Sequence, residues 1–123
     1  MAVGMIRTIV VDCIDPEPLA AFWSALLDIE VHHVHEQWIS LHPFRPGQAR
    51  IAFQRVPEAK ITKNRLHLDA WVADIPTATI AAIALGATAV GKLVEDDSEP
   101  FQILADPAGN EFCLVHTPGS EGV

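Results

Sequence analysis

The chain has 123 residues, which is the length of one domain, and 8 Lys and Arg stand against 16 Asp and Glu to give a formal net charge of −8. Half of the residues are apolar and 20% are charged, a composition typical of a globular protein and not of a disordered one. Because nucleic acids and anionic membranes attract basic proteins, we expect neither as a partner.

Short apolar runs and sparse cysteines point to a cytoplasmic protein. The apolar run near the N-terminus, Ile9 to Val11, is too short for a signal peptide or a membrane span. Cys13 and Cys113 lie in apolar segments without a CxxC spacing. We therefore expect buried thiols in a reducing compartment.

The first half of the chain predicts a strand, a helix and three more strands. Asp15 precedes a proline and a run of apolar residues at helical spacing, as an N-cap residue does. Phe22 and Trp23 share the apolar face with Leu19 and Leu26, so we expect them in the core. The expected ranges are strand 7–13, helix 16–27 and strands 31–36, 38–42 and 50–56.

The second half predicts the same order of elements. Asp74 is the expected N-cap of a helix that Gly86 closes, and Asp106 to Asn110 have the composition of a tight turn. The expected ranges are strand 66–72, helix 75–85 and strands 88–93, 101–105 and 111–116.

An internal similarity at an offset of 59 residues relates the two halves. Asp15 falls on Asp74 and Phe53 falls on Phe112 at this offset. We therefore expect an α+β fold of two β-α-β-β-β modules, residues 5–56 and 65–116 with a linker at 57–64, within a single domain of residues 1–123.

Three histidines lie close together at His32, His33 and His35. Strand alternation places His33 and His35 on one face and His32 on the other, so the three cannot converge on a metal ion. A solvated hairpin is the favoured interpretation, and His42 across the strand pair is a possible additional partner.

The order of elements and several motifs resemble the vicinal oxygen chelate superfamily, which includes glyoxalase I, bleomycin-resistance proteins and extradiol dioxygenases. The motifs are Asp15 seven residues before Phe22-Trp23, His67 seven residues before Asp74, and Asp106-Pro-Ala-Gly-Asn-Glu-Phe112. The stretches Phe53 to Pro57 and Lys63 to Asp69 look most like small glyoxalase-like domains. The resemblance implies that each module forms half of a barrel around a cleft.

In metal-using members the ligands come from the first and last strands of each module. The resemblance places these positions at Thr8, Gln54, His67 and Cys113, where the enzymes usually have His, Gln or Glu. Because His67 alone is a strong ligand of that kind, we expect no metal at these four positions and no cofactor, with a divalent metal ion as the alternative.

Strand alternation predicts which side chains share the cleft with these four positions. Asp69 and Trp71 should face the same side as His67, and Glu111 the same side as Cys113. The predicted ligand-binding residues are therefore Thr8, Gln54, His67, Asp69, Trp71, Glu111 and Cys113, with no catalytic residue assigned.

Two classes of function are compatible with this cleft. The first is metal-free binding or sequestration of a small organic ligand, as the resemblance to bleomycin-resistance proteins implies. The second is an enzyme, either a lyase or isomerase with a divalent metal or a protein that uses His67 for acid–base chemistry. The resemblance also implies a homodimer, with Trp38 or Phe44 available to a partner subunit.

Overall fold

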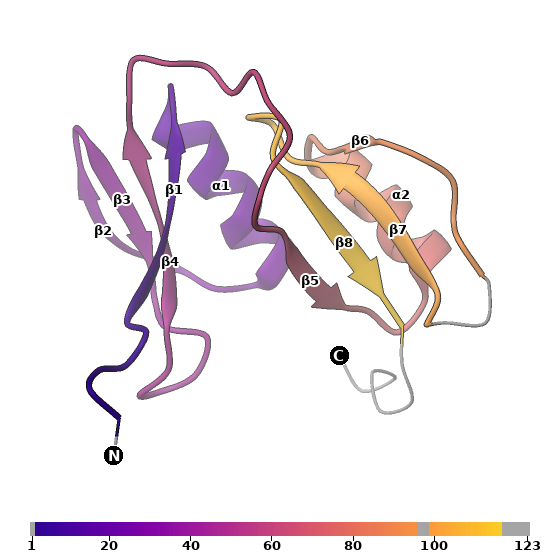
Figure 1. Ribbon diagram of the computed structural model, residues 1–123, viewed down its shortest axis with the longest axis horizontal. Coiled ribbons are helices and arrows are strands. Elements are labelled where there is room, and N and C mark those ends of the chain that lie inside the picture. Colours follow the sequence, from indigo (N-terminus) through magenta and orange to yellow (C-terminus); the bar gives the residue numbers. More distant parts are fainter. Residues whose placement is uncertain (1, 96–98, 117–123) are drawn as a thin grey trace. The chain divides into compact units, whose positions relative to one another are not determined.

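The computed structural model describes residues 2–95 and 99–116 and divides the chain into two compact units, residues 1–59 and 60–123. Each unit is a β-α-β-β-β module with one four-stranded sheet and one helix (Figure 1). The expected α+β class with two modules is thus confirmed. The central part of the charged segment at residues 95–99, and the tail from residue 117 onward, lie outside the described residues.

Unit 1 is a sheet with strand order β1-β4-β3-β2, in which β1 is parallel to β4 and the other neighbours are antiparallel. Helix α1 packs on β3 and β4. Its apolar stripe is buried, with Phe22 only 3% and Trp23 only 4% exposed, which confirms their place in the core. The elements are β1 (Thr8–Cys13), α1 (Pro16–Leu27), β2 (Val31–His35), β3 (Trp38–Leu41) and β4 (Arg50–Arg55).

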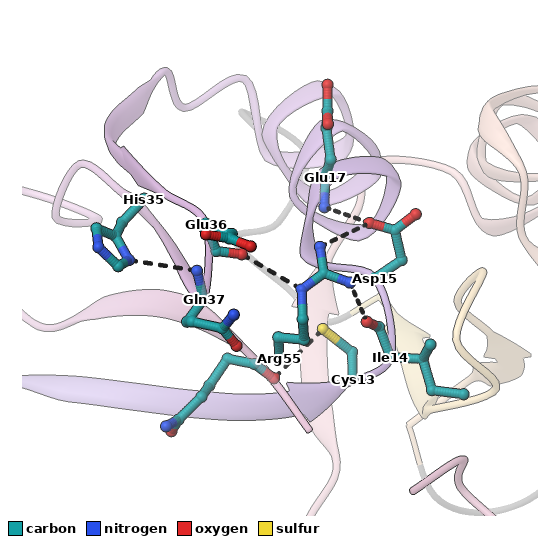
Figure 2. A network of polar contacts seen from close by, with 9 residues as sticks. Cys13, Ile14, Asp15, Glu17, His35, Glu36, Gln37 and Arg55 are labelled. Carbon is teal, nitrogen blue, oxygen red and sulfur yellow. Dashed lines mark hydrogen bonds and ion pairs between the residues drawn. The ribbon is translucent and has the colours of Figure 1, made fainter. Parts of the chain in front are cut away.

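The start of α1 is fixed by its predicted cap and by an arginine. A side-chain oxygen of Asp15 accepts a hydrogen bond from the backbone N–H of Glu17. The Arg55 guanidinium lies 3.6 Å from the Asp15 carboxylate and donates to the carbonyl oxygens of Ile14 and Glu36 (Figure 2). Arg55 therefore connects β4, the end of β1 and the β2–β3 turn within unit 1.

Unit 2 repeats this topology with strand order β5-β8-β7-β6 and a parallel β5–β8 pair. Asp74 accepts a hydrogen bond from the backbone N–H of Thr77, and Gly86 ends the helix, as predicted. The elements are β5 (Leu68–Trp71), α2 (Ile75–Leu85), β6 (Thr88–Ala89), β7 (Phe101–Ala105) and β8 (Glu111–Val115). Among the described residues no helix is long and apolar enough to cross a membrane.

One strand is shorter than the sequence indicates. The expected strand 88–93 is reduced to the two residues of β6. The Gln102 side chain is buried in β7 and donates a 2.6 Å hydrogen bond to the carbonyl oxygen of Gly91, just beyond the backbone hydrogen bond from Val90 to Ile103. The chain bends at Gly91 and returns to β7 only through an isolated bridge between Val94 and Phe101.

The two modules differ in the register of their parallel strands. In unit 1 Gln54 pairs with Asp12, whereas in unit 2 Cys113 pairs with Asp69. At the sequence offset of 59, the residue in unit 1 that corresponds to Asp69 is Val10, and its partner is Ala52. The strand pairing therefore differs between the two modules by two residues relative to the sequence repeat.

The turn between β7 and β8 requires a glycine at one position. Gly109 has a φ of 88°, where a side chain is strained, although a Cβ atom added there would come no closer than 4.0 Å to Lys60. We expect Gly109→Ala to lower the free energy of unfolding by about 1 kcal/mol in urea denaturation. Gly91→Ala is the control, because Gly91 lacks a positive φ and has open space around it; equal losses for both variants would contradict the strain argument.

Candidate functional site

The sheet of unit 2 has one face turned to its helix and one face open. In β8, Phe112 and Leu114 are buried, whereas Glu111, Cys113 and Val115 are half-buried. In β5, Asp69 and Trp71 are exposed. Since residues paired across neighbouring strands point to the same side, the open face carries the predicted site residues of this unit.

Three potential ligand side chains meet at one place on this face. Nε2 of His67 is 3.4 Å from Oδ1 of Asp69, and Asp69 is in register with Cys113. One ligand atom from each of His67, Asp69 and Cys113 lies within 4.8 Å of the others. The structure thus brings His67, Asp69 and Cys113 together, with His67 and Asp69 exposed and Cys113 half-buried.

Glu111 is held beside this cluster by residues from the segment before β5. Nζ of Lys63 donates a 2.6 Å hydrogen bond to Oε1 of Glu111, and Nδ2 of Asn64 donates to the Glu111 backbone oxygen at 3.1 Å. The hydrogen bond from Lys63 and then its charge lower the pKa of Glu111. Sequence patterns do not predict that Lys63 pairs with Glu111, because the two residues are 48 positions apart and the pairing has no local signal.

The Lys63–Glu111 pair predicts a measurable pH effect. Lys63→Met should raise the Glu111 pKa toward its ordinary value, because the variant loses both the hydrogen bond and the positive charge. A lowered folded-state pKa gives stability that is present above the unfolded pKa of 4.5 and is lost as the pH falls through the folded-state value. At neutral pH the Lys63→Met variant should therefore be less stable than the unaltered protein. This difference in the free energy of unfolding should disappear as the pH falls below the Glu111 pKa. Carboxyl ¹³C NMR titration measures the shift; an unchanged Glu111 pKa would contradict the pairing.

The Cys113 thiol is unsuited to act as a nucleophile at neutral pH. Partial burial, then the negative charge of Asp69 and a hydrogen bond to it, raise the pKa of Cys113 above its ordinary value. Neither Cys113 nor Cys13 forms a disulfide. In this state Cys113 is a neutral group that donates a weak hydrogen bond to Asp69.

The open face becomes apolar one row further along the sheet. Trp71 pairs with Val115, and Val115 pairs with Phe101 of β7. Trp71 is 56% exposed, so much of its indole is free of protein contacts. Phe101 was not among the predicted site residues, because its place opposite Val115 follows only from the β7–β8 register. An aromatic row therefore adjoins the polar cluster.

The predicted residues of unit 1 do not form a matching cluster. Thr8 pairs with Arg50, whereas Gln54 pairs with Asp12, so Thr8 and Gln54 are separated by four residues along the strands, about 13 Å at the usual rise. Gln54 is exposed and its other neighbour across the sheet is Trp38. Thr8 and Gln54 cannot both contact one ion.

A hollow of about 310 Å³ lies elsewhere in unit 1, beside the start of α1. Its wall includes Glu17, Val34, Ile39 and Arg55. Arg55 already contacts the Asp15 carboxylate and the carbonyl oxygens of Ile14 and Glu36, so its guanidinium serves to connect the elements of unit 1. None of the predicted site residues lines this hollow.

Two β-α-β-β-β units, each with a parallel pair between its first and last strands, define the architecture of the glyoxalase/bleomycin-resistance/dioxygenase class. Comparison with known structures shows the same fold. A glyoxalase/bleomycin resistance protein/dioxygenase family enzyme from Burkholderia phytofirmans PsJN is 18% identical with a TM-score of 0.76, over 92% of this chain and 98% of that one. A glyoxalase-related enzyme from Fulvimarina pelagi is 14% identical with a TM-score of 0.75, over 94% and 90%.

The sequence itself matches the family described as Glyoxalase-like domain over residues 8–115. The chain therefore belongs to the glyoxalase-like domain family. No match was found among curated proteins.

Proposed function

We propose that this protein binds a small organic ligand on the open face of the unit 2 sheet, without a resident metal ion. The single observation that carries this proposal is the adjacency of a polar cluster and an exposed indole across two rows of one sheet. Asp69 and His67 supply hydrogen-bonding groups, and Trp71 supplies a flat apolar surface.

This arrangement fits a ligand with two different ends. A hydroxyl or amino group at one end would donate to the Asp69 carboxylate and contact the His67 imidazole. An aromatic or flat apolar part would lie on Trp71 and the row that continues through Val115 and Phe101. Binding of this kind, followed by sequestration, is the role that the resemblance to bleomycin-resistance proteins implies.

A metal-dependent lyase or isomerase is the second candidate, and the geometry of one cluster favours it. His67, Asp69 and Cys113 offer nitrogen, oxygen and sulfur donors within 4.8 Å of one another, a donor set that suits zinc with an open position. A bound zinc would supply Lewis-acid chemistry. Against it, the raised pKa of Cys113 opposes the thiolate form that a metal needs.

Elemental analysis and a fragment screen distinguish these two functions. Protein purified without an affinity tag should contain less than about 0.1 zinc, nickel, iron or manganese per chain, and aromatic alcohols and amines should show saturation-transfer NMR signals. About one metal ion per chain, lost in His67→Ala and in Cys113→Ser, would overturn the metal-free proposal and support the metalloenzyme.

We also propose a homodimer and a cytoplasmic location. Ile80 and Ile83 on α2 are 72% and 46% exposed, and Trp38 and Phe44 are half-buried, which leaves apolar side chains for a partner subunit. Light scattering at high micromolar concentration tests the assembly, and a monomer mass would contradict it.

A further inference from the structure

Three basic side chains meet at one end of the unit 1 sheet. Arg50 begins β4, His42 follows β3, and His32 lies in β2. Nη1 of Arg50 is 3.1 Å from Nδ1 of His32. The rings of His32 and His42 meet edge to face with centroids 4.6 Å apart. We call these three residues the basic row.

A β-bulge brings His32 into the basic row. Val31 pairs with Leu41, but His33 pairs with Ser40, so His32 is the extra residue of β2. Strict alternation predicts that His32 faces away from His33, and the bulge interrupts the alternation on which that prediction rests. The contacts of His32 with His42 and Arg50 follow from this interruption.

The sheet register explains why Arg50 and His42 face each other. Ser40 pairs with Ala52 in the antiparallel β3–β4 ladder, and continuing this register by two residues places His42 opposite Arg50. Thr8 of β1 pairs with Arg50 on its other side. The basic row therefore crosses the sheet from β4 to β2, next to a threonine hydroxyl.

The charge of the basic row is not neutralised within the described part of the chain. There, Arg50 forms no ion pair with a carboxylate, and its Nε is buried without a hydrogen-bond partner. The charges that act on His32 are those of His42, Arg50 and His33. Loss of hydration and these positive charges lower the pKa of His32. In a chain of net charge −8, such a cluster is unusual.

Charged residues from the neighbouring segments surround the row without reversing its sign. Arg7 precedes β1 and accepts the backbone N–H of Arg50 on its own carbonyl oxygen, and Arg45 lies in the loop between β3 and β4. The acidic residues before β2 are Asp28 and Glu30, and the backbone oxygen of Glu30 accepts from the N–H of His42. Two further arginines and two acidic residues thus lie in the segments next to the row, which leaves the row's own positive charge in excess.

The hydrogen-bonding roles favour an anion over a metal ion. Arginine only donates, so Nδ1 of neutral His32 accepts from Arg50 and its proton lies on Nε2. This tautomer leaves no lone pair for a metal, and the guanidinium repels a cation. Protonation of Nδ1 turns the acceptor into a donor and releases the Arg50 N–H toward a shared anion.

We propose that Arg50, His42 and His32 form a binding site for a phosphate group, which binds more tightly at mildly acid pH. Three donors, from β4, from β2 and from the residue after β3, match the several oxygens of a tetrahedral anion better than the two coplanar oxygens of a carboxylate. The site lies in unit 1 and is independent of the ligand face proposed for unit 2.

NMR titration of the histidine ring protons with inorganic phosphate, at constant ionic strength, tests the site. The dissociation constant should be at least tenfold lower at about pH 6 than at about pH 8, where histidine is neutral. Sulfate keeps its charge across this range and should show the same trend. Acetate should bind at least tenfold more weakly than sulfate. Methyl phosphate binding as tightly as inorganic phosphate would identify a phosphate monoester as the ligand; weaker binding would identify the free ion.

Variants locate the site. Arg50→Gln should abolish saturable binding, and His42→Gln should weaken it at least fivefold and remove most of the pH dependence. His35→Gln is the matched control on the same strand as His32, because Nδ1 of His35 accepts from the backbone of Gln37 and not from the basic row. Unchanged binding in both Arg50→Gln and His42→Gln, or equal binding of acetate and sulfate, would overturn the proposal. If Arg50→Gln fails to fold, His42→Gln decides alone.

Discussion

Replacing Phe53 by alanine is expected to lower the free energy of unfolding by about 3–5 kcal/mol. Phe53 is 0% exposed and pairs with Ile39 in the ladder that packs against α1. The loss combines the removed apolar contacts with the cavity that remains, because a sheet and a helix can close around it only in part. Single domains have a free energy of unfolding of about 5–15 kcal/mol, so this one substitution removes a large share of the total stability.

Urea denaturation followed by far-ultraviolet circular dichroism measures this loss. Val34→Ala is the control, because Val34 is 69% exposed and its truncation should change stability by less than about 0.5 kcal/mol. Phe112 is the repeat counterpart of Phe53 and is 1% exposed, so Phe112→Ala should cost a similar amount. A loss below about 1 kcal/mol in Phe53→Ala would show that unit 1 does not have the described core.

Truncation of the ligand face in unit 2 should reduce ligand affinity strongly without unfolding the protein. Trp71→Ala and His67→Ala should each raise the dissociation constant of the best fragment from the screen at least tenfold. Trp71 is 56% exposed and His67 is exposed, so neither contributes much to the core. Trp71→Phe retains an aromatic surface and should restore most of the affinity.

Stability measurements separate binding from structure in these variants. Leu85→Ala is the control, because Leu85 is 43% exposed and lies on α2, away from the sheet's open face. If His67→Ala lowers the melting temperature and leaves fragment affinity per folded molecule unchanged, the His67–Asp69 pair is structural. In that case His67 would not belong to the binding site. The Trp71 variants alone would then test whether the ligand binds on this face.

Local patterns in the sequence determined the helices and their starts. Asp15 and Asp74 cap α1 and α2 as predicted, because a carboxylate before a proline and an apolar stripe specifies a helix start within a few residues. The tight turn at Asp106 is likewise local: its carboxylate accepts the N–H groups of Ala108 and Asn110. Strand alternation also placed Asp69 and Trp71 together on the exposed side of β5.

The tertiary structure alone decided which of these strands lie in register and which side chains meet. The two-residue shift between the parallel pairs sets Cys113 beside Asp69, whereas Gln54 lies beside Asp12 and not beside Val10, the repeat counterpart of Asp69. The bulge at His32 and the reach of Lys63 to Glu111 depend on the same pairing across long stretches of chain. Register follows from how whole strands pack against a helix and one another, and no short window of sequence contains that information.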